Sequence, residues 1–235
     1  MPCLEIENLH TFYGSSHILF DVSLQVEEGE SVCLLGRNGA GKTTTLKTIM
    51  GLAQGKGGAI RFDGESLLGR EPYQIAQLGV GYVPDDRLIF PDLTVRENLE
   101  LAIKQGRDGA APWTVERVYE LFPALTLLDR RLGGYLSGGE QQMLTIGRTL
   151  MGNPSLLLLD EPVEGVAPVV VQELTRQIKN LKGMGLTLLF AEQNLHFAAE
   201  VSDRAYVIEK GRIRFHGSMQ ELAANEEVKS KYLMI

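Results

Sequence analysis

A glycine-rich segment in the first quarter of the chain constrains the fold more than any other feature. Residues 36–43 read Gly-Arg-Asn-Gly-Ala-Gly-Lys-Thr, which fits the pattern G-x-x-x-x-G-K-[ST]. The continuously apolar run 31–36 predicts a strand buried on both faces, and residues 42–52 predict a helix directly after it. Glycines let successive backbone N–H groups point into one concavity, at which the helix also presents its N-terminus. The segment therefore predicts a strand, a phosphate-binding loop and a helix in succession.

The polar side chains of this loop have defined roles in that interpretation. Lys42 reaches the β- and γ-phosphates of a nucleotide, and the Thr43 hydroxyl coordinates Mg²⁺. The alternative is a plain glycine-rich turn, which the buried strand before it and the helix after it disfavour. The candidate nucleotide-binding residues here are Gly36, Arg37, Asn38, Gly39, Ala40, Gly41, Lys42, Thr43 and Thr44.

A second buried strand ends in two acidic residues. Residues 156–161 read Leu-Leu-Leu-Leu-Asp-Glu. At the end of such a strand, Asp160 can hold the Mg²⁺ shell and Glu161 can polarise an attacking water. Alone, the pattern is equally well a core strand followed by two solvated acids, but paired with the phosphate loop it predicts a nucleotide-hydrolysing site.

The remaining pattern is that of a mixed α/β chain. Buried-strand runs at 80–84, 155–160 and 186–190 surround a stretch at roughly 86–152 whose pattern is helical. Between the last two strands, Pro168 and Gly183 mark the start and end of a helix. Three capping boxes mark helix starts, at Thr94 with Glu97, Ser137 with Glu140 and Ser218 with Glu221. We expect one domain, with a parallel α/β core at about 1–85 and 153–235 and a helical insert at about 86–152.

Composition excludes several classes of protein. The 235 residues are 44% hydrophobic, as in ordinary globular proteins, and carry 23 basic against 30 acidic side chains, a formal charge of −7. A net acidic chain argues against binding the backbone of a nucleic acid. No targeting segment or bilayer-length apolar run is visible, so we expect a soluble, cytoplasmic chain that meets a membrane through partners. Cys33 lies in an apolar run, which predicts a buried free thiol.

A third motif narrows the function. Residues 136–142 read Leu-Ser-Gly-Gly-Glu-Gln-Gln, a capped helix start that forms a second anion-binding terminus. The chain already has one phosphate-binding loop. A second anion-binding helix terminus therefore implies that the loop of one chain and the terminus of another act on the same nucleotide. In these three motifs the chain resembles the ATP-binding cassette (ABC) ATPases, whose signature is an LSGGQ-type segment.

The resemblance covers essentially the whole chain and implies a fold and further site residues. The implied fold is α/β, a P-loop NTPase (RecA-like) core with an antiparallel β subdomain and an inserted α-helical subdomain. Tyr13 matches the aromatic residue that stacks on adenine; a surface aromatic is the alternative. In this family two cassettes close head-to-tail over two ATP molecules, so that the signature of one chain completes the phosphate loop of the other. The signature residues are Ser137, Gly138, Gly139 and Glu140.

Longer segments narrow the resemblance to one subgroup, the LivF-type ATPases of the high-affinity branched-chain amino acid importers. These segments are 36–52, 81–99, 136–162 and 190–194. The ATPases of urea and short-chain amide importers are closely similar. The resemblance implies a second ABC ATPase as partner, in a heterodimer or else a homodimer, together with two membrane permease subunits and, indirectly, a periplasmic solute-binding protein. The helical insert and the loop 84–92 would face the permeases, at the cytoplasmic face of the inner membrane. No nucleic acid partner is implied.

Three positions depart from the general ABC pattern. Asp85 replaces a Gln that approaches Mg²⁺, and Gln193 replaces the switch His, so that it can donate to a γ-phosphate oxygen but cannot carry a proton. Ala167 replaces an Asp that makes a contact across the dimer. We expect the chain to form half of an unequal pair, in which its own ATP site is the slower one. His196 is a weaker candidate for a displaced switch residue.

Other functions fit the motifs less well. A soluble ABC ATPase acting on DNA or ribosomes would need a coiled-coil insert or a second cassette, and the segment between Lys42 and Ser137 shows no sustained heptads. Gln193 and Asp85 favour a non-hydrolysing nucleotide sensor, but the retained Glu161 argues against it. An exporter ATPase is disfavoured by the subgroup match.

Overall fold

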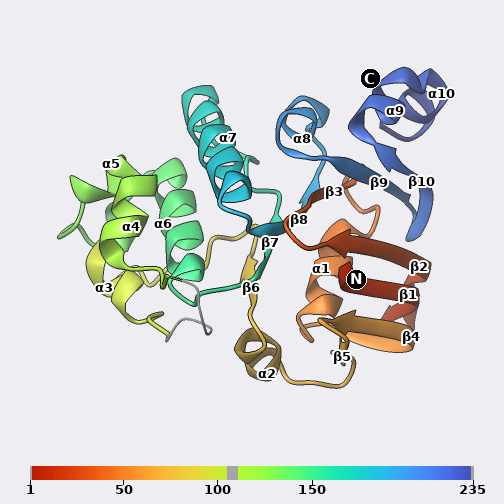
Figure 1. Cartoon of the computed structure of the whole chain (residues 1–235), viewed down its shortest axis with the longest axis horizontal. Helices are drawn as coiled ribbons and strands as arrows, with labels where there is room; N and C mark the ends of the chain where they lie inside the picture. The colour runs from red at the N-terminus through yellow and green to blue at the C-terminus, as the bar shows by residue number, and fades with distance from the viewer. Residues whose placement is uncertain (1, 105–110, 234–235) are drawn as a thin grey trace.

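The site is carried by a six-stranded, mostly parallel sheet. A computed structural model describes residues 2–104 and 111–233 of the chain (Figure 1). The strand order is β10-β9-β3-β8-β7-β6, in which β10 alone pairs antiparallel with its neighbour. The strands are β3 (Ser31–Leu35), β6 (Val80–Val83), β7 (Leu156–Asp160), β8 (Thr187–Glu192), β9 (Arg204–Glu209) and β10 (Arg212–Ser218).

Strands β3, β7 and β8 are buried at every position, as their unbroken apolar runs predict. Because β3, β6, β7 and β8 run parallel, their carboxyl ends meet at one edge of the sheet. The segments that leave these ends are the glycine-rich loop, the chain at Asp85, the Asp160–Glu161 pair and the chain at Gln193. The topology therefore brings four sequence-distant segments to one place.

A second, antiparallel sheet has the order β2-β1-β4-β5. Val22, Leu24 and Val26 of β2 are buried and alternate with exposed residues, which confirms the alternation seen in the sequence. Figure 1 shows this sheet on the opposite side of the molecule from α3–α6. Its strands are β1 (Pro2–Tyr13), β2 (Ser16–Glu27), β4 (Gln54–Phe62) and β5 (Glu65–Ser66).

Helices cover both sheets and end the chain. The helical segments of the described residues are α1 (Lys42–Ile49), α2 (Pro72–Gln77), α3 (Val95–Glu100), α4 (Val115–Leu121), α5 (Pro123–Thr126), η1 (Gly133–Tyr135), α6 (Gly138–Leu150), α7 (Pro168–Gly183), α8 (Leu195–Val201), α9 (Met219–Ala224), α10 (Glu226–Val228) and η2 (Lys229–Leu233).

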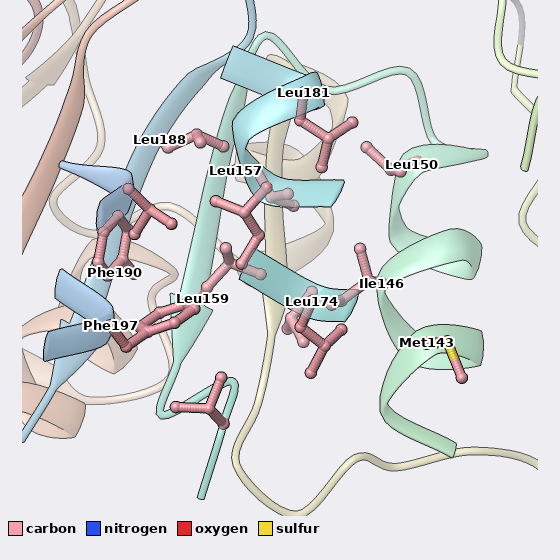
Figure 2. Packing of buried hydrophobic residues seen from close by; sticks show 14 of the residues in the cluster. Met143, Ile146, Leu150, Leu157, Leu159, Leu174, Leu181, Leu188, Phe190 and Phe197 are labelled. Atoms are coloured by element: carbon pink, nitrogen blue, oxygen red, sulfur yellow. The ribbon is translucent and has the colours of Figure 1, made fainter. Parts of the chain in front are cut away.

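Two apolar clusters form the core, one on each face of the six-stranded sheet. Alternate residues of β7 point to opposite faces, so Leu157 and Leu159 join one cluster and Leu156 and Leu158 the other. The second cluster packs the sheet against α1 and the antiparallel sheet. Figure 2 shows the first cluster, in which side chains of α6 face α7 and those of α7 face β7 and β8. The residues labelled there are Met143, Ile146, Leu150, Leu157, Leu159, Leu174, Leu181, Leu188, Phe190 and Phe197.

Several predicted boundaries are confirmed. Helix α7 begins at Pro168 and ends at Gly183. The three capping boxes are present, and in each the hydroxyl accepts the N–H of the Glu three residues on. The box at Ser218 begins α9, and the short segments α10 and η2 follow it.

Two segments differ from their sequence patterns. Helix α1 ends at Ile49, not at residue 52, because Gly51 has φ +71° and a Cβ there would lie 2.6 Å from the carbonyl oxygen of Arg70. In the stretch 86–152, loops and η1 separate α3, α4, α5 and α6, while residues 105–110 lie outside the described part. The division into core and helical insert stays a prediction. Within residues 2–104 and 111–233, no helix has the length and apolarity required to cross a bilayer.

Candidate nucleotide site

The glycine-rich loop joins β3 to α1 in a conformation that depends on its glycines. Gly41 precedes α1 with φ +112°, a region that side-chain-bearing residues avoid. A Cβ at Gly36 would lie 2.5 Å from the carbonyl oxygen of Ile208. A side chain at either position would therefore displace the loop from the edge of the sheet.

Lys42 curls back over this loop. Its side chain is 3% exposed, and Nζ donates to the carbonyl oxygens of Gly36 at 2.9 Å and Arg37 at 3.2 Å. Nζ also lies 3.0 Å from Oε1 of Glu161. A buried ammonium group needs such partners, because removing a charge from water is costly. The arrangement holds one positive charge at the mouth of the loop.

Asp160, at the end of β7, accepts hydrogen bonds from side chains of α1 and β6. Its Oδ1 accepts from Thr43 Oγ1 at 2.9 Å, and its Oδ2 accepts from the Tyr82 hydroxyl at 3.0 Å. Burial raises the pKa of Asp160 to about 6; these two hydrogen bonds oppose the rise, and the charges of Asp85 and Glu161 add to it. Burial and the neighbouring Asp160 raise the pKa of Tyr82, so that its phenol stays a donor at neutral pH.

Glu161 and Glu164 form a carboxyl pair beside Lys42. Burial favours the neutral form of Glu161, but its hydrogen bonds with Glu164 and Lys42 outweigh burial and lower its pKa. The same hydrogen bond and the charge of Glu161 raise the pKa of Glu164 to about 7. At neutral pH Glu161 is therefore the ionised member, placed to act as a base.

Lys42, Thr43, Glu161 and Glu164 line one cavity of about 450 Å³, whereas Asp160 and Tyr82 are not among its lining residues. The cavity combines residues from β1, β2, the glycine-rich loop, α1, the chain after β6 and the chain after β7. The lining residues are Tyr13, Ile18, Asn38, Gly39, Gly41, Lys42, Thr43, Thr44, Asp85, Glu161 and Glu164. Of the loop residues predicted from the sequence, Gly36 and Arg37 supply carbonyl oxygens to Lys42, and Ala40 is buried in the core.

Gln193 lies in an adjoining cavity of about 390 Å³ that shares Asn38, Glu161 and Glu164 with the first. Asp85 lines the first cavity, and its Oδ1 accepts the N–H of Asp86. His196 lines a different groove, between α7 and α8. Ala167 precedes α7 without a side-chain cap.

The signature segment does not line either cavity. Ser137 is exposed and begins α6, and the Glu140 carboxylate accepts the N–H of Ser137 at 2.6 Å. A Cβ at Gly138 would lie 2.8 Å from an Arg87 nitrogen, and one at Gly139 would lie 2.8 Å from Val170. The two glycines let the start of α6 pack closely, and Ser137 is exposed without lining the cavity of the chain's own phosphate loop.

Three residues near the site were not predicted from the sequence, namely Tyr82, Glu164 and Glu192. Tyr82 lies on β6, next to β7, so its approach to Asp160 follows from the pairing of strands distant in sequence. Glu164 is one of several acids after β7 and carries no distinguishing pattern. The sequence does contain a signal for Glu192, because this acid directly follows the apolar run 186–191.

The oxygen ligands fit Mg²⁺ that arrives with a nucleotide. Mg²⁺ is usually held by one or two carboxylates together with substrate phosphates. The Thr43 hydroxyl and the Asp160 carboxylate are adjacent, at 2.9 Å. Among the described residues no group of three His, Cys, Asp or Glu side chains is arranged to hold a metal ion. The donor set therefore suits a nucleotide-bound ion.

Comparison with known proteins gives relatives along the whole chain. The ABC transporter family model matches residues 19–164. The chain is 42% identical over 230 residues to the high-affinity branched-chain amino acid transport ATP-binding protein BraG of Pseudomonas aeruginosa, covering 98% of this chain and 99% of BraG. It is 38% identical over 235 residues to the lipopolysaccharide export system ATP-binding protein LptB of Haemophilus influenzae, covering 99% and 98%.

A solved structure agrees with the fold. The crystal structure of a nucleotide-free ATP-binding cassette from an ABC transporter superposes with a TM-score of 0.82 at 27% identity, covering 97% of each chain. This likeness confirms the predicted α/β P-loop NTPase fold. The family match covers the glycine-rich loop, the signature and the Asp160–Glu161 pair. The chain therefore belongs to the ABC transporter ATPases, the ATP-binding and ATP-hydrolysing cassettes of this family.

Proposed function

We propose that this ATPase energises an importer of branched-chain amino acids. The observation that carries the proposal is the cavity in which Lys42 faces Glu161, together with a signature, Ser137, exposed elsewhere on the same chain. A chain built this way holds two half-sites and needs a second cassette to complete either. The 42% identity to BraG supports the substrate class.

Five side chains in or next to the cavity have defined roles in this proposal. Tyr13, 47% exposed at the end of β1, stacks on the adenine ring. Lys42 and the loop N–H groups bind the phosphates. Thr43 and Asp160 hold Mg²⁺, which neutralises charge on the transferring phosphoryl group. Asp85 is a further ligand candidate on the same cavity.

Glu161 is the general base of the proposed hydrolysis. In the nucleotide-free chain its carboxylate is ion-paired with Lys42. Lys42 has to leave this pair to bind phosphate, so binding releases Glu161 to accept a proton from water. Gln193, in the adjoining cavity that Glu161 also lines, can donate its amide N–H but cannot relay a proton.

A separate groove on the chain supports docking of a permease. About 690 Å³ in volume, it lies between α2, β6 and the segments at 90 and 101–104, and it is lined by Tyr73, Phe90, Leu101 and Lys104 among others. Tyr73, Phe90 and Leu101 are exposed, which gives the groove an apolar surface of the kind that marks a protein interface. Peripheral attachment to the inner face of a membrane follows from such docking.

The test is purification of the tagged Glu161→Gln chain from native membranes with Mg-ATP, followed by mass spectrometry. The substitution removes the base and retains the closed complex. We expect two permeases, a second ATPase and a solute-binding protein, which is then assayed for leucine, isoleucine and valine. A Lys42→Ala chain is the matched control and retains fewer partners, because it cannot bind phosphate.

Three results would contradict the proposal. Recovery of lipopolysaccharide export subunits would assign the chain to the function named for LptB. A solute-binding protein that takes urea or amides would change the substrate class. Recovery of ribosomes, DNA or no membrane subunit would make the chain a non-transport ABC ATPase.

A further inference from the structure

Glu192 is a buried acid that the functions described so far do not use. It ends β8, a strand buried at all six positions, and it is 3% exposed. Charged side chains are almost never buried without specific partners, because desolvation of the charge is costly. A buried carboxyl group beside a catalytic cavity therefore needs an explanation from its contacts.

The Glu192 side chain holds the turn that follows β8. Its Oε2 accepts the backbone N–H groups of Gln193 and Asn194, each at 3.0 Å. Its Oε1 is buried and makes no hydrogen bond to the described part of the chain. At the other end of the turn, Asn194 Oδ1 accepts the N–H of Phe197 and caps α8. Two side chains thus fix the two ends of a two-residue turn.

The main chain before this turn is anchored independently of the side chain. The N–H of Gly36 donates to the carbonyl oxygen of Glu192 at 3.2 Å, and the N–H of Glu161 donates to that of Ala191 at 3.0 Å. These bonds tie β8 to the phosphate loop and to the catalytic base. Gln193, one residue further on, has its N–H held by the Glu192 carboxyl group.

We propose that Glu192 is a positioning residue for ATP hydrolysis, whose carboxyl group sets where Gln193 lies relative to Glu161. Gln193 and Glu161 both line the cavity of about 390 Å³, and Asn38 and Glu192 line it as well. Two backbone N–H groups that donate to one buried side-chain oxygen hold the turn in a single conformation. The inference concerns the ATPase activity itself and does not depend on which substrate is transported.

The experiment compares three variants of the full chain. Glu192→Ala removes the acceptor. Glu192→Gln keeps an oxygen that accepts the same N–H groups. Glu200→Ala is the matched control; it removes an exposed ion pair between Glu200 on α8 and Lys179 on α7. The first readout is amide hydrogen exchange of the peptide around 193–194 in the nucleotide-free chain. The second is kcat and KM for ATP at this chain's own site, measured in the complex purified with its partners, in which the partner ATPase carries the substitution that matches Glu161→Gln and so contributes little turnover.

For Glu192→Ala we expect exchange at 193–194 to rise about tenfold, the effect of losing a backbone hydrogen bond. We expect kcat to fall roughly tenfold, since small displacements of a positioned group have effects of this size, with KM for ATP within about twofold of wild type. Exchange in the loop 36–43 stays unchanged, because its bond is to the Glu192 main chain. Glu192→Gln restores both readouts, and Glu200→Ala changes neither.

Each other result overturns the proposal. Unchanged exchange at 193–194 would mean that the side chain does not hold the turn. Faster exchange with unchanged kcat would mean that the turn does not serve hydrolysis. A loss of kcat without faster exchange, or one that Glu192→Gln does not rescue, would assign Glu192 a different role. If Glu192→Ala fails to fold, Glu192→Asp replaces it, because the shorter side chain draws the acceptor away from the two N–H groups.

Discussion

At the residue scale, the centre of the site is an ion pair between a buried cation and a half-buried base. Lys42 is 3% exposed and Glu161 is 12% exposed, with 3.0 Å between Nζ and Oε1. Removal of one member of a buried pair leaves an uncompensated charge, whereas replacement of both is often tolerated. The pair therefore links the stability of the nucleotide-free chain to the groups that bind and hydrolyse ATP.

The first prediction separates these two roles. Lys42→Met should lower the free energy of unfolding by about 2 kcal/mol, less than for a fully buried pair because water still reaches Glu161. The double variant Lys42→Met, Glu161→Gln should recover most of this loss, yet both variants should lose ATP binding. Urea unfolding and nucleotide titration measure the two effects. Additive losses in the double variant would show that the pair contributes nothing to stability.

The second prediction concerns Glu192 and pH. Burial raises its pKa from 4.5 to about 7, against the hydrogen bonds from Asn194 and Gln193. The folded chain thus keeps a proton that the unfolded chain releases, so the contribution of Glu192 to stability is present below pH 4.5 and is lost as pH rises through about 7. The rise of the pKa from 4.5 to about 7 corresponds to a loss of about 3 kcal/mol.

Urea unfolding of wild type and Glu192→Gln across pH 4.5–8, without nucleotide, measures this loss. Asp160 and Glu164 also have raised pKa values, but they are common to both proteins and cancel in the difference. We expect the stability of wild type relative to the variant to fall as pH rises. Parallel pH profiles would show that Glu192 has an ordinary pKa.

At the element scale, α6 connects the signature to the loop that precedes α3. Its N-terminus carries Ser137, and further along it Thr145 Oγ1 donates to the Arg87 carbonyl and Arg148 Nη2 to that of Leu88, both at 2.6 Å. Arg87 and Leu88 have positive φ angles of 63° and 30°, a backbone strain that these bonds stabilise. These two hydrogen bonds therefore tie this loop to the helix that carries the signature.

The third prediction uses two equivalent helix caps. Ser137→Ala and Thr94→Ala each remove the hydroxyl of a capping box and should each lower the free energy of unfolding by about 1 kcal/mol. Only Ser137→Ala should also reduce ATP turnover, because Ser137 belongs to the exposed signature that completes a partner's site. Equal turnover in the two variants would remove Ser137 from the ATPase mechanism.

At the scale of the whole molecule, the chain presents two incomplete ends of an ATP site. The phosphate loop and Glu161 line one cavity, and the signature at α6 lies outside it. Gln193 stands where a proton-carrying switch residue is expected, and Ala167 leaves α7 without a side-chain cap. The half-site with the phosphate loop has Gln193 in place of a proton-carrying residue, whereas the half-site with the signature is intact. This difference suits a heterodimer in which the signature of this chain completes the faster site.

The fourth prediction tests this asymmetry in the assembled complex. Glu161→Gln in this chain should reduce total ATPase activity less than the matching substitution in the partner ATPase, because the partner's site carries most of the turnover. Steady-state phosphate release from the two singly substituted complexes is the measurement, with the double substitution as the baseline. Equal losses would mean that the two sites are equivalent.

Much of the fold and site followed from local pattern alone. Each of these features lies within a dozen consecutive residues, so its chemistry can be predicted from the sequence. They are the phosphate loop, its flanking strand and helix, the Asp160–Glu161 strand end and the cap at Ser137. Helix α1 was predicted too long, although Gly51, whose φ is +71°, is a local signal for the end of a helix. The close approach of the Arg70 carbonyl to Gly51 joins segments about twenty residues apart and cannot be predicted from local pattern.

The amino-acid sequence by itself determined which groups can bind phosphate, hold a cation and activate water. The tertiary structure alone decided which of them meet: the Tyr82 and Thr43 hydroxyls on Asp160, and Lys42 on Glu161. The reason is physical. Strand order and parallel register place the ends of β3, β6, β7 and β8 at one edge, and pairing between distant strands is set by packing of the whole core.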